Sequence, residues 1–387
     1  MRKLTSQLLL IFTFVGIVCY GQSRVPVFVS GEEGHKSYRI PAIIKLKNGD
    51  LLAFCEGRVN DPGDFGDINI VMKRSGDDGK SWTALQTIVD AGKLQGGNPA
   101  PVVDRSDPAY PNGRIFLFYN TGNNHESEVR KGNGLREVWY KTSTDNGVTW
   151  SEAVNITAQV HRPRKPELHA GYRFDEDWRS YANTPGHAIQ LEKGDYHGRI
   201  FVAANHSSGS PQAGFIDYAA HGFYTDDHGK SFHLSETVPL PGSNESTAAE
   251  LSGGRVMLNS RNQKGDVRAR IVSISNDGGA IWDTTYFDKR LPDPVNEASL
   301  LTLKYGRKKN VLAFCNAADP NRRDHLTLRI SHNDGQYWDK SILIDQSPDG
   351  KGDFTAYSDL VKLSRRKVGV LYERDNYRQI VFSVIKW

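Results

Sequence analysis

The stretch Ser75-Gly-Asp-Asp-Gly-Lys-Ser-Trp82 decides the fold, because the chain repeats it. Four further copies follow the same template, S-x-D-x-G-x-T-W, and they begin at Ser143, Thr225, Ser275 and Ser331. In this turn the aspartate can accept backbone N–H bonds, the glycine allows a positive φ, and the aromatic residue packs beside the turn. The pattern is loosely kept, since Ile281 and Tyr337 replace the threonine and Asn333 replaces the aspartate. We therefore interpret these aspartates as structural turn residues.

A second pattern alternates with these turns. Six times a polar turn leads into a short apolar strand, at residues 49–54, 113–118, 198–203, 254–258, 309–314 and 366–371. Short strands at regular intervals, without a long apolar run at helical spacing, are typical of an all-β array. We predict a six-bladed β-propeller with four antiparallel strands in each blade, an arrangement that protects the sheet edges. The six apolar strands are expected to be innermost.

Five turn motifs for six blades leave one blade without a motif. We predict that this is the last blade, and that a strand at residues 25–29 pairs with the C-terminal region to close it. A solenoid is the alternative, but the chain shows no polar end-caps. The propeller is expected to be a single domain over residues 22–387. The longest interruption begins at residue 161 and is rich in aromatic residues, so it forms either a surface loop or a wall of a ligand cleft.

Composition excludes several classes of protein. The chain has 387 residues, 38% of them hydrophobic, which is enough to bury a large core without a disulfide or metal. Its 49 basic and 45 acidic side chains give a net charge of +4, so a nucleic-acid module built on bulk charge is excluded. No CxxC or HExxH motif occurs, and a structural zinc site is therefore not predicted. Cys55 and Cys315 are interpreted as buried strand residues.

The N-terminus has the features of an export signal. Arg2 and Lys3 precede an apolar stretch at residues 8–18, and small and polar residues follow. We predict a secretory signal peptide over residues 1–21, and we expect the mature protein in the periplasm, on the surface or in the medium of a bacterium. A membrane anchor is one alternative, although the stretch is shorter than the roughly 20 residues that a span needs. Lipidation at Cys19 is another.

The motif Tyr38-Arg-Ile-Pro-Ala42, together with the five turns, resembles the exo-α-sialidases of glycoside hydrolase family 33, in which such turns are called Asp-boxes. The resemblance covers essentially the whole mature chain. It implies a retaining exo-sialidase that releases terminal α-linked sialic acids from glycoproteins, glycolipids or oligosaccharides through a covalent tyrosine intermediate. We also predict a monomer without cofactor or metal, without an integral membrane segment after signal removal, and without affinity for nucleic acid.

The resemblance implies three arginines that bind the substrate carboxylate. Arg39 belongs to the Arg-Ile-Pro motif, Arg261 follows an expected strand in Leu-Asn-Ser-Arg-Asn, and Arg323 precedes one in Arg-Arg-Asp-His. Arg322 is the alternative to Arg323. Sialic acid carries a carboxylate on its anomeric carbon, and guanidinium groups bind carboxylates through paired hydrogen bonds while staying charged.

The same carboxylate bears on the nucleophile. A carboxylate nucleophile would be repelled by the anionic centre, whereas a neutral tyrosine would not, although its pKa near 10 requires a base beside it. Tyr357, in Ala-Tyr-Ser-Asp-Leu, matches the tyrosine of the family. Glu245, in Asn-Glu-Ser-Thr-Ala, matches its glutamate partner, and we assign the nearby Glu250 to the following strand.

The resemblance implies three further site residues. Asp64 matches the acid/base residue on the loop after the first apolar strand, with Asp67 as the alternative. Arg58 matches another arginine of the binding pocket, and Glu373 matches a glutamate that orients Arg39.

Other functions remain compatible with these residues. They are the hydrolysis of a related nonulosonic acid, intramolecular trans-sialidase activity with the same catalytic residues, and noncatalytic binding of sialosides. The last uses none of the tyrosine, glutamate and aspartate chemistry, so the presence of all three argues against it.

Overall fold

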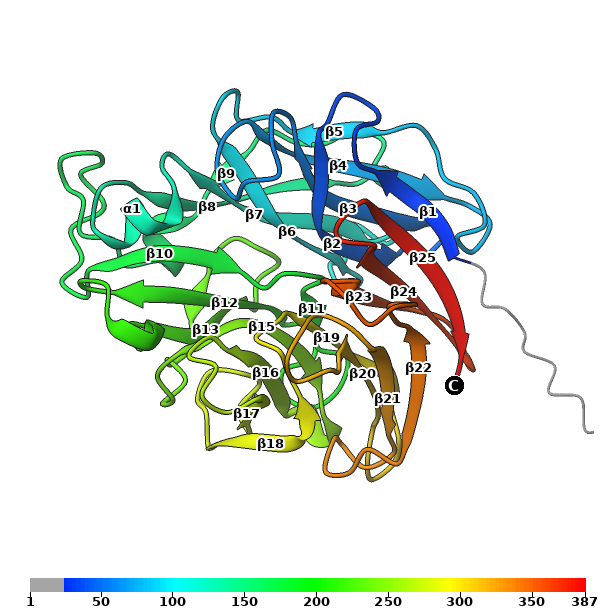
Figure 1. Ribbon diagram of the computed structural model, residues 1–387. Coiled ribbons are helices and arrows are strands. Elements are labelled where there is room, and N and C mark those ends of the chain that lie inside the picture. The colour runs from blue at the N-terminus through cyan, green and yellow to red at the C-terminus, as the bar shows by residue number, and fades with distance from the viewer. Residues whose placement is uncertain (1–23) are drawn as a thin grey trace, which may run out of the picture.

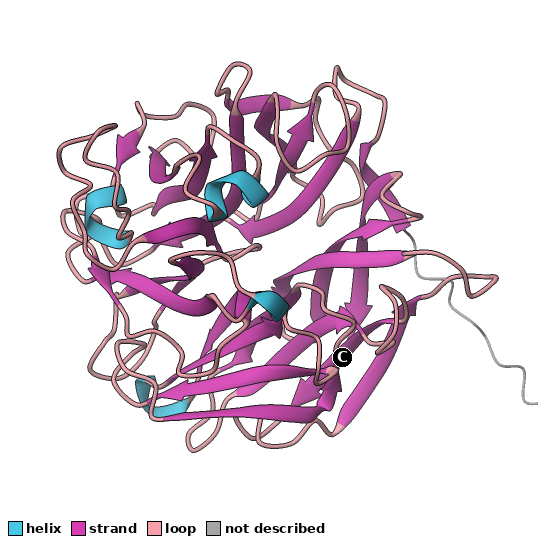
Figure 2. Ribbon diagram, turned by 60° about the vertical axis from the view of Figure 1, so that its left-hand side comes forward, coloured by secondary structure: helices cyan, strands magenta, loops and turns pink. Residues whose placement is uncertain are grey.

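The computed structural model describes residues 24–387, in which 25 strands form an all-β propeller (Figure 1). The predicted signal peptide at residues 1–21 lies outside the described residues. Helices are short, such as α1 (Glu126–Arg130) and α2 (Thr157–Val160), and strands dominate the molecule (Figure 2). None of the helices in residues 24–387 has the length and apolar character needed to cross a membrane.

The strands of the described chain form five sheets, three of which have four strands. The first of these three contains β15 (Ser243–Glu250), β16 (Val256–Asn262), β17 (Ala269–Ser275) and β18 (Thr284–Pro292). The second contains β19 (Ala298–Lys304), β20 (Val311–Ala317), β21 (Leu326–Ser331) and β22 (Lys340–Asp345). The third contains β23 (Thr355–Ser364), β24 (Lys367–Arg374), β25 (Gln379–Lys386) and β1 (Arg24–Val29).

The remaining two sheets hold the other strands of residues 24–387. A five-stranded sheet contains β10 (Trp178–Asn183), β11 (Ile189–Gln190), β12 (Ile200–Ser208), β13 (Tyr218–Thr225) and β14 (His233–Leu234). An eight-stranded sheet contains β2 (Ser37–Lys45), β3 (Leu51–Arg58), β4 (Ile68–Ser75), β5 (Gln86–Val89), β6 (Gln95–Asp104), β7 (Arg114–Gly122), β8 (Arg136–Ser143) and β9 (Val154–Asn155).

The predicted six blades of four strands are therefore wrong. Four of the sheets in residues 24–387 are separate blades, but the other eight strands form one continuous sheet. A parallel bridge between Ile68 of β4 and Gln95 of β6 joins the two halves of that sheet. The turn and strand pattern of the sequence counts hairpins, and it carries no information about such lateral pairing.

The strands around the axis also differ from the prediction. The apolar strands expected to be innermost are β3, β7, β12, β16, β20 and β24, and each pairs with a preceding strand that lies nearer the axis. These axial strands bond to one another across sheets. The Ile43 amide of β2 and the Ser299 hydroxyl of β19 both donate to the carboxylate of Asp359 on β23. Polar side chains on the axial strands hid them from a search for apolar runs.

The predicted closure of the last sheet is confirmed. Strand β1, at the start of the described chain, pairs antiparallel with β25 near its end, and the two lie side by side in Figure 1. This sheet carries no Asp-box in its sequence. The first and last parts of the described chain are thus joined within one blade.

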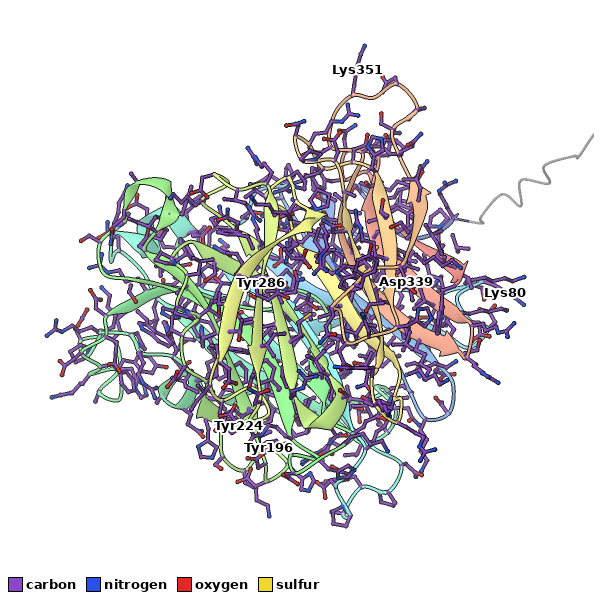
Figure 3. All side chains as sticks on the ribbon, turned by 90° about the horizontal axis from the view of Figure 1, so that it is seen from below. Lys80, Tyr196, Tyr224, Tyr286, Asp339 and Lys351 are labelled. Carbon is purple, nitrogen blue, oxygen red and sulfur yellow. The ribbon has the colours of Figure 1, made fainter. Side chains whose placement is uncertain are left out.

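The Asp-boxes form the hydrogen-bonded turns that the sequence indicated. Asp77 Oδ1 accepts the N–H groups of Lys80 and Ser81, at 3.0 Å each, and Gly79 has a φ of 86°. Lys80 itself extends outward at the periphery (Figure 3). In the degenerate fifth copy the amide oxygen of Asn333 accepts an N–H in the same way, which explains why the aspartate is replaceable there.

Irregular pairing at one end of the axial strands shapes the site. The register shifts between Arg39 and Ala42 in β2, and comparable shifts occur in β6, β15 and β23. A bulge of this kind redirects the side chains beside it. Ile40 has a φ of 62°, which is unusual for a β-branched residue, and its N–H donates to Glu373 Oε1 at 2.9 Å. The bulges therefore turn several side chains toward the same space.

Candidate active site

The bulged ends of the axial strands surround a cavity of about 240 Å³. Its lining includes seven of the eight predicted site residues, which are Arg39, Arg58, Asp64, Glu245, Arg261, Arg323 and Tyr357. They come from β2, β3, β15, β16, β23 and two loops. The opposite ends of the axial strands surround a second cavity, of about 370 Å³, whose lining includes Glu250 and Tyr305.

The three predicted clamp arginines reach the first cavity with different partners. Arg39 Nε donates to Glu373 Oε1 at 2.7 Å, and Arg323 Nη1 donates to the hydroxyl of Tyr377 at 3.0 Å. Arg261 Nη1 donates to Glu245 Oε2 at 2.6 Å. Burial alone would lower the pKa of each guanidinium, but the acidic and phenolic neighbours outweigh it and raise the pKa. Three cationic groups thus converge on a space that suits an anion.

Tyr357 and Glu245 form a direct pair. The Tyr357 hydroxyl lies 2.6 Å from Glu245 Oε1 and 2.7 Å from Oε2, and it donates to this carboxylate. Arg261 Nη1 also reaches the phenol oxygen, at 3.0 Å. Burial raises the pKa of Tyr357 well above its ordinary value, and the nearby Glu245 raises it further. The phenol is therefore neutral in this state, with a base and a cation beside it.

Asp64, another residue of the cavity lining, lies on the loop between β3 and β4. Its side chain is 73% exposed, and its Oδ1 lies 2.7 Å from Arg58 Nη1. Arg58 is held from behind by the buried Glu56, whose Oε2 lies 2.7 Å from Nη2. The surrounding cavity partly desolvates Asp64, which raises the pKa of its carboxyl, but the Arg58 and Arg39 charges outweigh this and lower the pKa. Asp64 is thus a carboxylate at neutral pH in this state.

Glu373 lies behind the cavity. Its carboxylate accepts from Arg39 Nε, from the Ile40 amide and from the Tyr357 amide, the last at 3.1 Å. The side chain is completely buried. It therefore joins the bulges of β2 and β23, which carry an arginine and the tyrosine.

The residues considered as alternatives lie elsewhere. Arg322 pairs with Asp319 and Asp324. Glu250 lines the second cavity, and its carboxylate accepts the backbone N–H groups of Glu192 and Lys193. Asp67 immediately precedes β4, and its backbone carbonyl accepts the amide of Val59.

Part of the cavity wall was not predicted from the sequence. This part includes Gln95, Glu126, Arg136, Ser180 and Tyr218. Glu126 Oε1 accepts hydrogen bonds from the hydroxyls of Tyr218, at 2.5 Å, and Ser180, at 3.1 Å. Single polar residues outside a recognisable motif give no local signal. Among the described lining residues none comes from 161–178, although Ser180 follows that segment closely.

One group of acidic and histidine side chains in residues 24–387 is close enough to hold a metal ion. It consists of Asp104, Asp107 and His228. Protein groups already engage it, since Asp104 Oδ2 lies 2.8 Å from His228 Nδ1 and Asp107 Oδ2 lies 3.1 Å from Arg114 Nη2. We interpret the group as a contact between neighbouring sheets.

The axial strands of this propeller thus bring three arginines and a tyrosine–glutamate pair to one cavity, which suits an anionic ligand. Residues 49–370 match the BNR repeat-like domain, and the chain belongs to that family. A sialidase of Micromonospora viridifaciens is 33% identical over 363 residues, which cover 89% of this chain and 51% of that protein. An exo-alpha-sialidase of Arthroderma benhamiae is 29% identical over 367 residues, covering 89% and 79%.

A solved structure agrees with these relatives. A Hadza microbial sialidase superposes with a TM-score of 0.75 at 25% identity, covering 94% of this chain and 68% of the other. The resemblance to family 33 sialidases that the sequence indicated is confirmed by these similarities. The chain spans about half the length of its Micromonospora relative.

Proposed function

We propose that this protein is a retaining exo-α-sialidase that acts on sialylated glycans. The observation that carries the proposal is the convergence of three arginines, the Tyr357–Glu245 pair and Asp64 on one cavity. The arginines would hold the carboxylate on the anomeric carbon, and each charge-assisted bond contributes about 1.5–3 kcal/mol. Binding in this orientation brings the anomeric carbon to the tyrosine.

The first step transfers the sugar to Tyr357. The phenol oxygen bonds to the anomeric carbon while its proton passes to Glu245, which already accepts it at 2.6 Å. Arg261 contacts both groups, so its charge stabilises the phenolate character that develops on Tyr357. The bond to the leaving oxygen breaks as Asp64 donates a proton to that oxygen. The transition state has oxocarbenium character.

The second step releases the sugar. Water attacks the anomeric carbon and Asp64 takes a proton from that water. The bond between the anomeric carbon and the Tyr357 oxygen breaks, and Glu245 returns its proton to that oxygen. The contact with Arg58 favours the carboxylate form of Asp64, which suits this second role directly. For the first role the bound glycan has to cover the exposed carboxyl and weaken that contact, because excluding water raises the pKa of a carboxylic acid.

The sequence also supports proposals about the domain organisation, oligomeric state and export of the enzyme. We propose that residues 22–387 act as one propeller domain, that the protein is a monomer, and that it is exported, because Arg2, Lys3 and the apolar residues 8–18 form a signal peptide. The sialidase relatives support glycans with terminal sialic acid as substrates.

Proton NMR of the reaction with an α-sialoside tests the proposal. Double displacement through Tyr357 should release free sialic acid as the α anomer, which then mutarotates. Release of the β anomer first would exclude the covalent mechanism. An anhydro sugar would identify intramolecular transfer, and binding without any release would refute the enzymatic function.

A further inference from the structure

Two buried carboxyl groups hold the backbone at Tyr357. Glu373 accepts the Tyr357 amide at 3.1 Å, and Glu297 Oε2 accepts the Ser358 amide at 2.8 Å. The Tyr357 amide lies within the bulge of β23, between Thr355 and Ser358, and Ser358 is the residue at which regular pairing with β24 resumes. The Tyr357 amide lacks a ladder partner because of the bulge, and β23 is an end strand of its sheet, so side-chain acceptors satisfy both amides. Glu373 was expected from the family pattern, whereas Glu297 was not.

Glu297 is held in place by its own segment. It lies one residue before β19, and the preceding Val295 has a φ of 66°. The amide of Asn296 donates to Asp293, and the carbonyl of Asn296 accepts from Arg270. A strained backbone fixed by side chains on both sides gives Glu297 a defined position. Glu297 itself is only 2% exposed.

The surroundings of Glu297 favour its neutral form. Burial raises the pKa of its carboxyl well above the usual value, and Asp359 of β23 and Glu245 of β15 raise it further, while Arg270 of β17 opposes them. Its second oxygen, Oε1, has no hydrogen-bond partner among the described residues. A neutral acid can still accept the Ser358 amide, and it avoids placing another negative charge near Glu245.

We propose that Glu297 is a positioning residue that holds the β23 bulge through the Ser358 amide and thereby directs the Tyr357 phenol at Glu245. The inference rests on the proposed sialidase function, because it assigns Tyr357 the reaction. Glu297 does not line the catalytic cavity and acts only through the backbone. A displacement of a reacting group by about 1 Å can cost about 100-fold in rate.

Two substitutions separate the length of the acceptor from its charge. Glu297→Gln keeps a carbonyl oxygen at the same reach, so kcat should stay within about threefold of the original enzyme. Glu297→Asp keeps the acid but shortens it by one methylene, so kcat should fall by about 10- to 100-fold with KM nearly unchanged. If a negative charge were the important property, the order would be reversed. The reversed order, equal loss in both variants, or full activity in both would overturn the proposal.

Glu250→Asp is the matched control. Glu250 is also a buried glutamate whose carboxylate accepts backbone N–H groups, but it lies at the opposite cavity. Shortening it should lower the melting temperature and leave kcat unchanged. An equal loss of kcat in Glu250→Asp would show that general destabilisation explains the result, and the positioning role would be refuted.

Amide hydrogen exchange gives an answer that does not depend on turnover. In Glu297→Asp, the peptide covering residues 355–360 should exchange faster than in the original protein, while Glu297→Gln should match it. Unchanged exchange in both variants would overturn the proposal. If the original protein released no sialic acid, the proposed function would fail, and the exchange result would still decide whether Glu297 holds the bulge. Should Glu297→Asp fail to fold, a tenfold loss of kcat in Glu297→Gln would suffice to refute it.

Discussion

Two tyrosine–glutamate pairs lie at opposite ends of the propeller axis. Tyr357 pairs with Glu245 at the catalytic cavity, and Tyr305 lies beside Glu250 at the second cavity. Strand β15 carries both glutamates. Burial raises the pKa of both tyrosines, and the adjacent glutamate raises each further. The two pairs therefore share residue types, and their glutamates share a strand.

Their cationic surroundings differ. Glu245 contacts the Arg261 guanidinium at 2.6 Å, whereas the Glu250 carboxylate accepts two backbone amides. An arginine can hold an anionic ligand and also stabilise a phenolate, but backbone amides that already bind the glutamate can do neither. We infer from the comparison that a tyrosine–glutamate contact alone is not enough for a nucleophile, and that the proposed role of Tyr357 also depends on the arginine beside it.

Removing each phenol tests this difference most directly. Tyr357→Phe should fold normally and lose turnover of an aryl α-sialoside by about 10³-fold or more, because the attacking oxygen is gone. Tyr305→Phe should retain turnover within about twofold, since that hydroxyl is remote from the cavity lined by Tyr357. Near-normal turnover by Tyr357→Phe would refute the mechanism, and an equal loss in Tyr305→Phe would refute the distinction between the two ends.

The next largest difference in kcat/KM should come from removing one arginine at each end of the propeller axis. Arg261→Met deletes a cation that contacts both Glu245 and Tyr357, so kcat/KM should fall by roughly 10- to 150-fold for each charge-assisted bond lost. Arg105→Met, at the second cavity, deletes an exposed arginine that donates to the Lys45 carbonyl, and kcat/KM should not change. Steady-state kinetics, with the affinity for an unreactive sialic acid analogue, measure both effects. Equal affinity for the analogue in Arg261→Met would contradict the clamp.

Most residues of the proposed site could be predicted from the sequence, whereas the number of blades and the axial strands could not. Arg39, Arg261 and Tyr357 were identifiable because each lies in a short motif beside an apolar strand. Glu297 and the wall around Glu126 were not, because their roles depend on contacts between segments distant in the chain. The order of strands around the axis was misassigned for a related reason. Axial strands such as β15 carry polar side chains that bond across the axis, so apolar runs revealed only their neighbours.

Three buried histidines form a third group of titratable side chains, whose pKa values no acidic neighbour raises. His161, His206 and His221 pack around Trp178, and burial lowers the pKa of all three, for His221 to about 3. The unfolded chain takes up these protons below about pH 6.5, while the folded protein does not. The free energy of unfolding should therefore fall with decreasing pH, by up to about 1.4 kcal/mol per pH unit for each histidine.

Replacing one histidine measures its share of this acid sensitivity. Both ring nitrogens of His161 lack a hydrogen-bond partner among the described residues, so His161→Phe should fold and show a smaller loss of stability between about pH 6.5 and 4. His233→Phe, which changes an exposed histidine of β14, serves as the control and should leave the pH dependence unchanged. Urea unfolding across this range provides the measurement. A slope in His161→Phe equal to that of the original protein would exclude the cluster as the cause.

The smallest expected effect is on the melting temperature of a variant of Glu250, at the second cavity. Burial raises the pKa of Glu250 above its usual value near 4.5, so the neutral acid is favoured more strongly in the folded protein than in the unfolded chain. The stability linked to this shift is present below about pH 4.5 and is lost as the pH rises through the raised folded pKa. Glu250→Gln is permanently neutral and keeps the carbonyl oxygen that accepts the backbone amides. Its melting temperature, relative to that of the original protein, should therefore increase between about pH 4 and pH 7. A constant difference would mean that the two backbone amides offset the burial of Glu250, and a raised pKa of its carboxyl would then be excluded.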